Sequence, residues 1–284
     1  MARQGISKKW VLSFNPCIEA DKNFYCPGNK ISRMHVSAIK EADVVILPPC
    51  CSEEFYRLVR THCRWVLPNY DAYFEYPGKV GQSHLFKKMG VAHPHTMAFG
   101  SLKMFKRIYK KFSGFDYPFV FKASFGGEGR YVFLVASQRE FEKCLEKAVG
   151  WEAQGEYGFL LQEFVPHGGR SLRIVVIGRS FHAYWRVQKG GNSFYTNVAK
   201  GASIEKEGEP ELVNLALDCL SNFCVKTGIN LAGFDFLFAE NDPTPAPLFL
   251  EINYFFRKRG LGGPDNYFKL LEQGVRDWIN HLPG

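Results

Sequence analysis

The chain has 284 residues, of which 46% are hydrophobic and 15% aromatic. This content excludes a largely disordered protein, and the length suffices for two or three domains with hydrophobic cores of their own. The net charge of +8 favours anionic partners such as nucleotides and acidic substrates, with nucleic acid as the lesser option, since only 257–259 form a tight basic cluster.

The composition of individual segments narrows the class of protein further. No apolar run approaches the roughly 18 to 20 residues that a membrane helix needs. The first ten residues, MARQGISKKW, have no apolar segment behind their charges, so we expect no signal peptide and a cytoplasmic location. The eight cysteines are scattered without a C-x-x-C pair, which predicts reduced thiols rather than disulfides or a zinc site.

The first 75 residues predict a small α/β domain. Apolar runs at 10–14, 43–47 and 64–69 have the length of buried strands. Ser52, followed by two glutamates, predicts a helix that begins there and ends near Cys63. Strands that alternate with helices favour a parallel sheet. Nothing in this region points to catalysis.

The next region contains a glycine-rich segment between two predicted strands. A short amphipathic helix is expected to end at Gly90, a basic helix at 101–112, and a strand at 117–122. The segment SFGGEGR follows directly after Lys122. Glycines allow backbone amides to approach phosphate groups, so this is a candidate phosphate-binding loop. The alternative is an ordinary hairpin turn.

A capping box at Ser137–Glu140 predicts a helix to about Val149, and FLLQEFV at 159–165 predicts a buried strand. This strand holds Gln162 and Glu163, which need partners if they are buried. Two hypotheses remain open for Glu163: it takes part in binding a ligand, or it forms a structural ion pair. Further helices are expected at 210–228, with proline early and glycine at the end, and at 265–281.

Two apolar runs, LAGFDFLFA and PLFLEIN, flank the turn-forming segment NDPTPAP and predict a hairpin. Glu251 and Asn253 are two residues apart and point to the same face of their strand. If the hairpin is centred near Pro243, Asp235 lies opposite Glu251. Two carboxylates and an amide oxygen suit Mg²⁺. The alternative is a solvated polar face, but charges within apolar strands need partners, which favours a metal site.

In this order, the motifs resemble the ATP-grasp superfamily and, more specifically, its RimK-like branch of glutamate ligases. The resemblance covers about residues 76–282 and includes the run GGRSLRIVVIGRSFHAYWRVQKGGNSFYTNVAKGA at 168–202. It implies an ATP-grasp fold of mixed α/β (α+β) class. A small N-terminal pre-grasp α/β domain (1–78) precedes a central subdomain with the glycine-rich loop (79–161) and a C-terminal subdomain with the metal site (162–284). The two α+β subdomains clamp ATP.

The resemblance also implies roles for individual residues. The lysines and the glycine-rich loop contact the nucleotide phosphates, and the segment 162–165 reads adenine and ribose. The implied nucleotide-binding residues are Lys79, Lys122, Gly126, Gly127, Gly129, Gln162, Glu163, Phe164, Val165 and Arg173. The implied catalytic residues are Arg186, Asn197 and Lys200, and the implied metal ligands are Asp235, Glu251 and Asn253. These ligands are expected to hold two Mg²⁺ ions, with Mn²⁺ as an alternative.

The implied function is that of an ATP-dependent carboxylate–amine ligase, an enzyme that forms an amide or peptide bond through an acylphosphate and releases ADP and phosphate. Its substrates would be small-molecule or peptide carboxylates and amines, without membrane or nucleic-acid partners, and a homo-oligomer is compatible with the family. The competing hypothesis is a non-catalytic ATP-grasp nucleotide-binding protein or a basic module that binds polyanions.

Four departures from the family pattern bear on activity and substrate choice. Ser171 replaces the usual Asp, Tyr131 stands at a common glycine position, and Tyr195 replaces an Arg of the glutamate ligase. The segment YFFRKRGLGG at 254–263 replaces a short N-x-x-P-G turn. This insert and the loop at 189–196 are expected to shape the choice of substrate, so that removing Arg257 and Arg259 would alter acceptor use. The identity of the substrates stays open.

Overall fold

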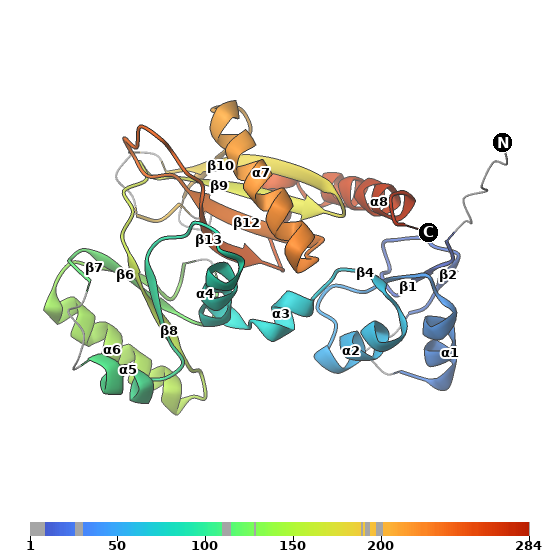
Figure 1. The fold of residues 1–284 in the computed structure, drawn as a ribbon, viewed down its shortest axis with the longest axis horizontal. Coiled ribbons are helices and arrows are strands. Elements are labelled where there is room, and N and C mark those ends of the chain that lie inside the picture. The colour runs from blue at the N-terminus through green and yellow to red at the C-terminus, as the bar shows by residue number, and fades with distance from the viewer. Residues whose placement is uncertain are drawn as a thin grey trace.

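The computed structural model describes residues 9–25, 31–109, 115–127, 129–188, 190, 194–196 and 201–283. Within them the elements form three separate sheets (Figure 1). No helix in these ranges is long and apolar enough to cross a membrane.

The first sheet is the predicted parallel sheet, with strand order β2–β1–β3–β4. Its strands are β1 (Val11–Ser13), β2 (Lys22–Asn23), β3 (Val44–Ile46) and β4 (Trp65–Leu67). Its helices are α1 (Arg33–Glu41) and α2 (Glu53–His62). The Ser52 side chain accepts a hydrogen bond from the Phe55 amide, which confirms the predicted start of α2. Helix α1 was not predicted; its N-cap is Ser32, and the His35 ring accepts from the Ser32 amide.

The second sheet is antiparallel, with the order β5–β8–β6–β7. Its strands are β5 (Thr96–Phe99), β6 (Phe119–Ala123), β7 (Val132–Val135) and β8 (Phe159–Glu163). Helices α5 (Leu102–Tyr109) and α6 (Gln138–Ala153) cover one face (Figure 1). All of β8 belongs to this sheet, so the expected domain boundary at 161/162 falls inside a strand. Helices α3 (Asp71–Glu75) and α4 (Gly78–Met89) connect the first sheet to the second (Figure 1).

The third sheet is also antiparallel, with the order β11–β10–β9–β12–β13. Its strands are β9 (Arg170–Ile177), β10 (Ser180–Val187), β11 (Ser203–Glu205), β12 (Leu231–Leu237) and β13 (Leu248–Asn253). Helix α7 (Pro210–Thr227) covers one face and α8 (Pro264–Asn280) the other, with the short 3₁₀ helix η3 (Lys258–Leu261) before α8 (Figure 1). As predicted, α7 begins with Pro210 and ends at Gly228, which has a left-handed φ of 73°.

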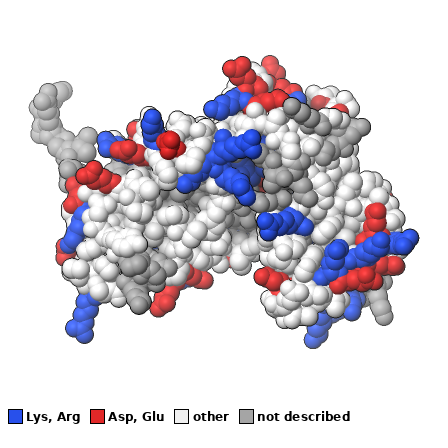
Figure 2. Space-filling view, turned by 180° about the vertical axis from the view of Figure 1, so that it is seen from behind, with Lys and Arg blue, Asp and Glu red and all other residues white. Residues whose placement is uncertain are grey.

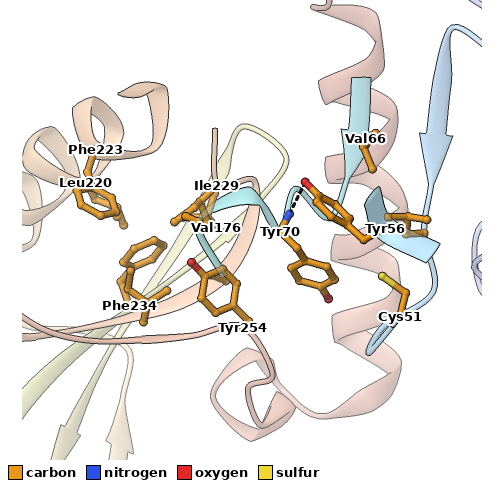
Figure 3. Close-up of a cluster of buried hydrophobic side chains, with 14 of the residues drawn as sticks. Cys51, Tyr56, Val66, Tyr70, Val176, Leu220, Phe223, Ile229, Phe234 and Tyr254 are labelled. Atoms are coloured by element: carbon orange, nitrogen blue, oxygen red, sulfur yellow. Dashed lines mark hydrogen bonds between the residues drawn. The ribbon is translucent and has the colours of Figure 1, made fainter. Parts of the chain in front are cut away.

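Strand β9 alternates between two hydrophobic cores. Leu172, Ile174 and Val176 pack on the side of α7, whereas Val175 and Ile177 pack on the side of α8. Each core also contains side chains of the first sheet. Figure 3 shows this continuity: Tyr70 lies between Tyr56 and Val66 of the N-terminal region on one side, and Val176, Phe234 and Tyr254 on the other. Val176 and Phe234 belong to the third sheet, and Tyr254 directly follows β13. The first and third sheets therefore form one packed body, while the second sheet has a core of its own.

Candidate active site

Two cavities meet at the edges of the second and third sheets. The first is lined by the glycine-rich loop and by residues of β6 and β8, and the second lies between the third sheet and the segment that follows β13. Four residues line both cavities: Gly127, Arg186, Asp235 and Glu251. A group bound in one cavity can therefore meet a group bound in the other at this junction.

The alternation of β6 and β8 places polar side chains on the cavity face of the second sheet. Phe121 and Leu161 point into the core, whereas Lys122 and Gln162 line the first cavity. Lys122 Nζ donates to Gln162 Oε1 over 2.6 Å, and Gln162 Nε2 donates to Thr96 Oγ1 over 2.7 Å. Lys122 is only 8% exposed, and this burial lowers the pKa of its ammonium group to about 8.

The glycine-rich loop has a conformation that requires glycine. Gly126 has φ +75°, and a Cβ there would lie 2.4 Å from Cδ2 of Tyr131. The ring of Tyr131 packs on Phe125 with centroids 4.8 Å apart, and Lys79 Nζ donates to the Gly126 carbonyl over 2.8 Å. Tyr131 therefore covers the loop at the position where a further glycine is common in the family, and it fixes the loop against the sheet. Gly127 and Gly129 line the same cavity.

The segment 162–165 borders the first cavity along its whole length, because Gln162, Glu163, Phe164 and Val165 all line it. The carboxylate of Glu163 makes no ion pair with any residue that the structure describes. Lys79, the second lysine predicted to bind phosphate, also lines this cavity, and its Nζ lies 3.2 Å from Glu251 Oε1.

Asp235 is the centre of the junction. It is the cross-strand partner of Glu251, as the hairpin predicted, and of Arg173 on its other side. Arg173 donates twice to it, with Nη2 to Oδ2 at 2.6 Å, and Arg186 Nη2 lies 2.8 Å from Oδ1. Burial alone would raise the pKa of the Asp235 carboxyl, but the two guanidinium groups hold it below its usual value. Asp235 is therefore ionised.

The three predicted metal ligands fit Mg²⁺ by chemistry and position. Asn253 Nδ2 lies 3.3 Å from Asp235 Oδ2, and both residues line the second cavity with Glu251. Two carboxylates and an amide oxygen are the hard oxygen ligands that Mg²⁺ prefers. In the described ranges no three His, Cys, Asp or Glu side chains gather, so a metal held here by three protein ligands would need this amide in addition to the two carboxylates. A metal at Asp235 would share that carboxylate with the two arginines or displace one of them.

Arg186 is oriented by a serine. Ser171 Oγ accepts from Arg186 Nε at 3.2 Å and donates to the Thr196 hydroxyl at 2.8 Å. With serine in place of the usual Asp, Asp235 is the carboxylate that pairs with Arg186. Burial lowers the pKa of the Arg186 guanidinium, although Asp235 opposes this effect.

The structure separates some of the residues that the sequence grouped together. Arg173 and Asn253 line the second cavity rather than the first. Asn197 and Lys200 lie outside the described residues. No sequence pattern indicated Gln82, a helix residue whose side-chain amide accepts from the N–H and donates to the C=O of Ile252, at 2.9 and 2.8 Å. This contact holds strand β13 in place at Ile252, between Glu251 and Asn253. A glutamine in an amphipathic helix is usually exposed to solvent, so the sequence contains no signal for this contact.

Comparisons with known proteins identify the family of the chain. A family model described as the RimK-like ATP-grasp domain matches residues 78–261. A probable alpha-L-glutamate ligase of Vibrio atlanticus is 24% identical over 216 residues, covering 72% of this chain and 66% of the relative. A protein of the same name from Marinobacter nauticus is 25% identical over 280 residues, covering 94% and 85%. The chain thus spans just under two thirds of the first relative's length.

The fold also matches a solved structure at low sequence identity. The ADP complex of an N5-carboxyaminoimidazole ribonucleotide synthetase superposes with a TM-score of 0.61 at 13% identity, covering 97% of this chain and 71% of that one. At this identity the likeness concerns the fold alone.

Proposed function

Since the chain belongs to the RimK-like ATP-grasp family, we propose that it is an ATP-dependent carboxylate–amine ligase that releases ADP and phosphate. The observation that carries the proposal is the junction of two cavities at Gly127, Arg186, Asp235 and Glu251. The first cavity contains the candidate phosphate-binding loop, and the second cavity is available to a second substrate. The names of the relatives, probable alpha-L-glutamate ligases, support the same reaction class.

In the first cavity we assign the nucleotide to the glycine-rich loop and the segment 162–165. Lys122 and Lys79 supply positive charge for the phosphates, and the backbone amides of Gly126, Gly127 and Gly129 can approach them closely. Phe164 and Val165 offer an apolar surface for the base, and the carboxylate of Glu163, which also lines the cavity, is an acceptor for ribose hydroxyls. Tyr131 holds the loop over the cavity.

We propose Asp235, Glu251 and Asn253 as ligands of Mg²⁺, with two ions expected and Mn²⁺ as a substitute. When bound, the metal neutralises charge on the phosphates during transfer. The chain's own part is to keep Asp235 ionised through Arg173 and Arg186, and to hold Glu251 and Asn253 on one strand face through the Gln82 contact with Ile252.

The proposed reaction has two steps at the junction. A carboxylate oxygen of the substrate in the second cavity bonds to the γ-phosphorus, and ADP leaves. An amine nitrogen then bonds to the carbonyl carbon, phosphate leaves, and the nitrogen loses a proton. Arg186, which lines both cavities and is oriented by Ser171, stabilises the charge of the transferring group. Asn197 and Lys200 are proposed to act beside it.

The three-part division of the chain is also part of the proposal. We place the second boundary after Glu163, because β8 pairs with β5 and β6 of the second sheet. The substrates are proposed to be small-molecule or peptide carboxylates and amines, and a reaction that uses ATP is expected in the cytoplasm. A homo-oligomer is compatible with this assignment.

Hydroxylamine provides a test that needs no knowledge of the natural amine, because it converts an acylphosphate into a hydroxamate. We expect wild type to form hydroxamate from L-glutamate or another carboxylate only when ATP and Mg²⁺ are present. Glu251→Gln, which removes one charge from a half-buried edge-strand residue, is expected to abolish product, while the exposed Glu272→Gln on α8 serves as the matched control.

Thermal melting separates the alternatives. Mg-ATP at 100 times its dissociation constant should stabilise wild type by about 2.7 kcal/mol. A shift in melting temperature without hydroxamate from any carboxylate would favour the non-catalytic nucleotide-binding protein. No shift, together with salt-sensitive binding of polyanions, would favour the basic module.

A further inference from the structure

The second cavity carries an inference about the substrate that rests on the proposed ligase function. We propose that the carboxylate substrate in this cavity carries an aromatic side chain. This side chain lies against the apolar wall, defined here as Tyr184, Ile204, Phe255, Phe256 and Pro264. Both phenylalanines belong to the insert at 254–263, which replaces a short turn of the family pattern, so the assignment concerns this chain in particular.

The size of the cavity suits a substrate with a bulky side chain. Its volume is about 690 Å³, which lies within the range of roughly 300 to 1,000 Å³ that is typical of sites for drug-sized ligands. The junction residues Asp235 and Glu251 form one part of its lining, and the apolar wall forms another. A substrate with its reacting carboxylate at the junction therefore has room to extend a side chain toward the wall.

The apolar wall is assembled from separate elements of the third sheet and its surroundings. Tyr184 comes from β10, Ile204 from β11 and Pro264 from the start of α8, while Phe255 and Phe256 follow β13. None of these side chains carries a charge, and three of the five are aromatic. Aromatic rings pair with one another edge to face or offset-stacked, which adds to the hydrophobic gain of burial. A wall of this composition favours an aromatic ligand.

Phe255 has the largest unburied apolar surface among these rings. It is 49% exposed, and no other phenylalanine in the parts of the chain that the structure describes is classed as exposed. Its ring contacts Tyr70 and Tyr73 of the N-terminal region, with centroids 6.0 and 5.6 Å apart. Packed on this side, the ring remains available to the cavity that it lines. A bound aromatic side chain would remove its remaining surface from water, which is favourable.

The charged residues at the junction are already engaged with one another. Arg173 and Arg186 are paired with Asp235, and Lys79 is paired with Glu251. These pairs leave the apolar wall as the part of the lining that gains most from contact with an uncharged side chain.

The basic residues of the insert are compatible with an aromatic ligand. The Lys258 ammonium lies over the rings of Phe268 and Tyr267, at 4.2 and 4.7 Å from their centroids. Arg257 and Arg259 also line the cavity, and a guanidinium group stacks favourably on the face of an aromatic ring. Figure 2 shows Lys and Arg side chains gathered near the middle of the molecular face opposite to Figure 1, with uncharged surface beside them.

The wall is held in place before any substrate binds. A Cβ on Gly260 would lie 2.0 Å from Cζ of Tyr184, so the 3₁₀ turn packs directly on this ring of β10. Phe256 contacts Tyr267 of α8 with centroids 5.8 Å apart, and Leu261 is buried in the core beneath. A surface that is already ordered loses less entropy when a ligand binds.

Two series of blocked dipeptides test the proposal: N-acetyl-X-Gly and N-acetyl-Gly-X, in which X is Ala, Leu or Phe. Each peptide has one free carboxylate, so the charge is constant and only the side chain changes. Calorimetry measures their binding to the full chain, and the hydroxylamine assay measures KM and kcat for each. In at least one series we expect the Phe peptide to bind at least tenfold more tightly than the Ala peptide, and more tightly than the Leu peptide.

Phe255→Ala should weaken the Phe peptide at least fivefold while the Ala peptide binds as it does to wild type. Its effect on turnover should appear in KM rather than kcat, because the wall does not touch the reacting atoms. Phe255→Tyr, which keeps the ring, should retain the preference. The matched control is Tyr157→Ala, which removes an exposed ring that lines neither cavity and should behave as wild type.

Melting temperatures show whether the variants fold. If Phe255→Ala does not, Phe255→Leu takes its place, since it keeps apolar bulk without the ring and should lower the preference for Phe over Ala at least threefold.

The binding measurement keeps this inference separate from the ligase assignment. If wild type makes no hydroxamate but binds the Phe peptide more tightly, and the preference is lost without the Phe255 ring, the inference holds and the ligase function fails. If wild type binds the Leu peptide as tightly as the Phe peptide in both series, or if the variants without the ring keep the preference, the inference is wrong whatever the turnover.

Discussion

The burial of Lys122 predicts that nucleotide binding at the proposed site depends on pH. The ordinary pKa of this lysine, 10.5, falls to about 8 in the folded protein because of burial. Between these two values the unfolded chain holds a proton that the folded chain has lost, so the contribution of Lys122 to the free energy of unfolding rises as the pH increases from 8 toward 10.5. Below pH 8 the folded state carries a buried charge, which a bound phosphate would stabilise.

We therefore expect ATP binding to take up a proton at Lys122. At pH 8 about half of the free protein has a neutral Lys122, so Mg-ATP should take up close to half a proton per molecule bound. Calorimetric titrations in two buffers of different ionisation enthalpy measure this number. Lys122→Met should remove the uptake and weaken binding, whereas Lys87→Met, on the exposed side of α4, should leave both as in wild type. Uptake that persists in Lys122→Met would contradict this.

At the residue level, the sequence predicted contacts that are local and missed those that are distant. Asp235 and Glu251 were placed opposite each other because one turn and a two-residue period determine their register. The pairing of Asp235 with Arg173 depends on how β12 meets β9, sixty residues earlier, which no local pattern specifies. The Gln82 contact with β13 was missed for the same reason.

The packing of α8 on the third sheet depends on two glycines. Gly274 of α8 lies against Ile177 of β9, and a Cβ there would be 2.7 Å from Ile177 Cγ2 and 2.8 Å from its carbonyl oxygen. Gly178 meets the same helix from the turn between β9 and β10, since a Cβ there would be 2.4 Å from the Gly274 carbonyl. The helix and the strand therefore approach more closely than side chains would allow.

We expect Gly274→Ala to destabilise the protein by about 1–3 kcal/mol, because the added methyl group overpacks a backbone contact that has to shift. Gly150→Ala is the matched control, since Gly150 lies in α6 with no atom within 4 Å of an added Cβ. There the substitution should stabilise by about 0.5–1 kcal/mol, from the helix preference of alanine. Denaturant unfolding measures both changes, and equal midpoints for the two variants would refute the packing argument.

At the level of elements, the sequence predicted those with strong local signals. Helices α2 and α6 each begin after a capping serine, and α7 begins with a proline and ends at a glycine. Each has an apolar stripe, and all three were predicted. Strand β5 was missed because it is short and only partly buried, and β11 because three residues of mixed polarity give no period. Both are edge strands, which tertiary pairing rather than propensity defines.

The whole molecule consists of two packed bodies with the candidate site between them. The second sheet with α5 and α6 has its own core, built around Phe121 and Phe159. The first and third sheets share two cores, and Asn230 joins them further, because its side chain bonds the Asn69 amide and the Val66 carbonyl at 2.7 and 2.9 Å. The N-terminal region therefore shares its hydrophobic cores with the third sheet, although its sequence predicts a separate α/β domain.

This division predicts which parts of the protein lose stability together. Phe121 and Phe234 are both fully buried, the first in the core of the second sheet and the second in a core that the other two sheets share. Replacing either by alanine should cost about 3–5 kcal/mol locally. Native-state hydrogen exchange, read by peptide, then reports which amides open more often.

We expect Phe121→Ala to accelerate exchange in β5, β6 and β8 while β1, β3 and β4 keep their protection. Phe234→Ala should accelerate exchange in the first and third sheets together, although β1 and β12 lie more than two hundred residues apart in sequence. Mg-ATP, bound between the bodies, should slow exchange on both sides of the junction. Faster exchange in β1, β3 and β4 of Phe121→Ala would mean that the molecule unfolds as one unit. The two bodies would then not close on the nucleotide as separate units.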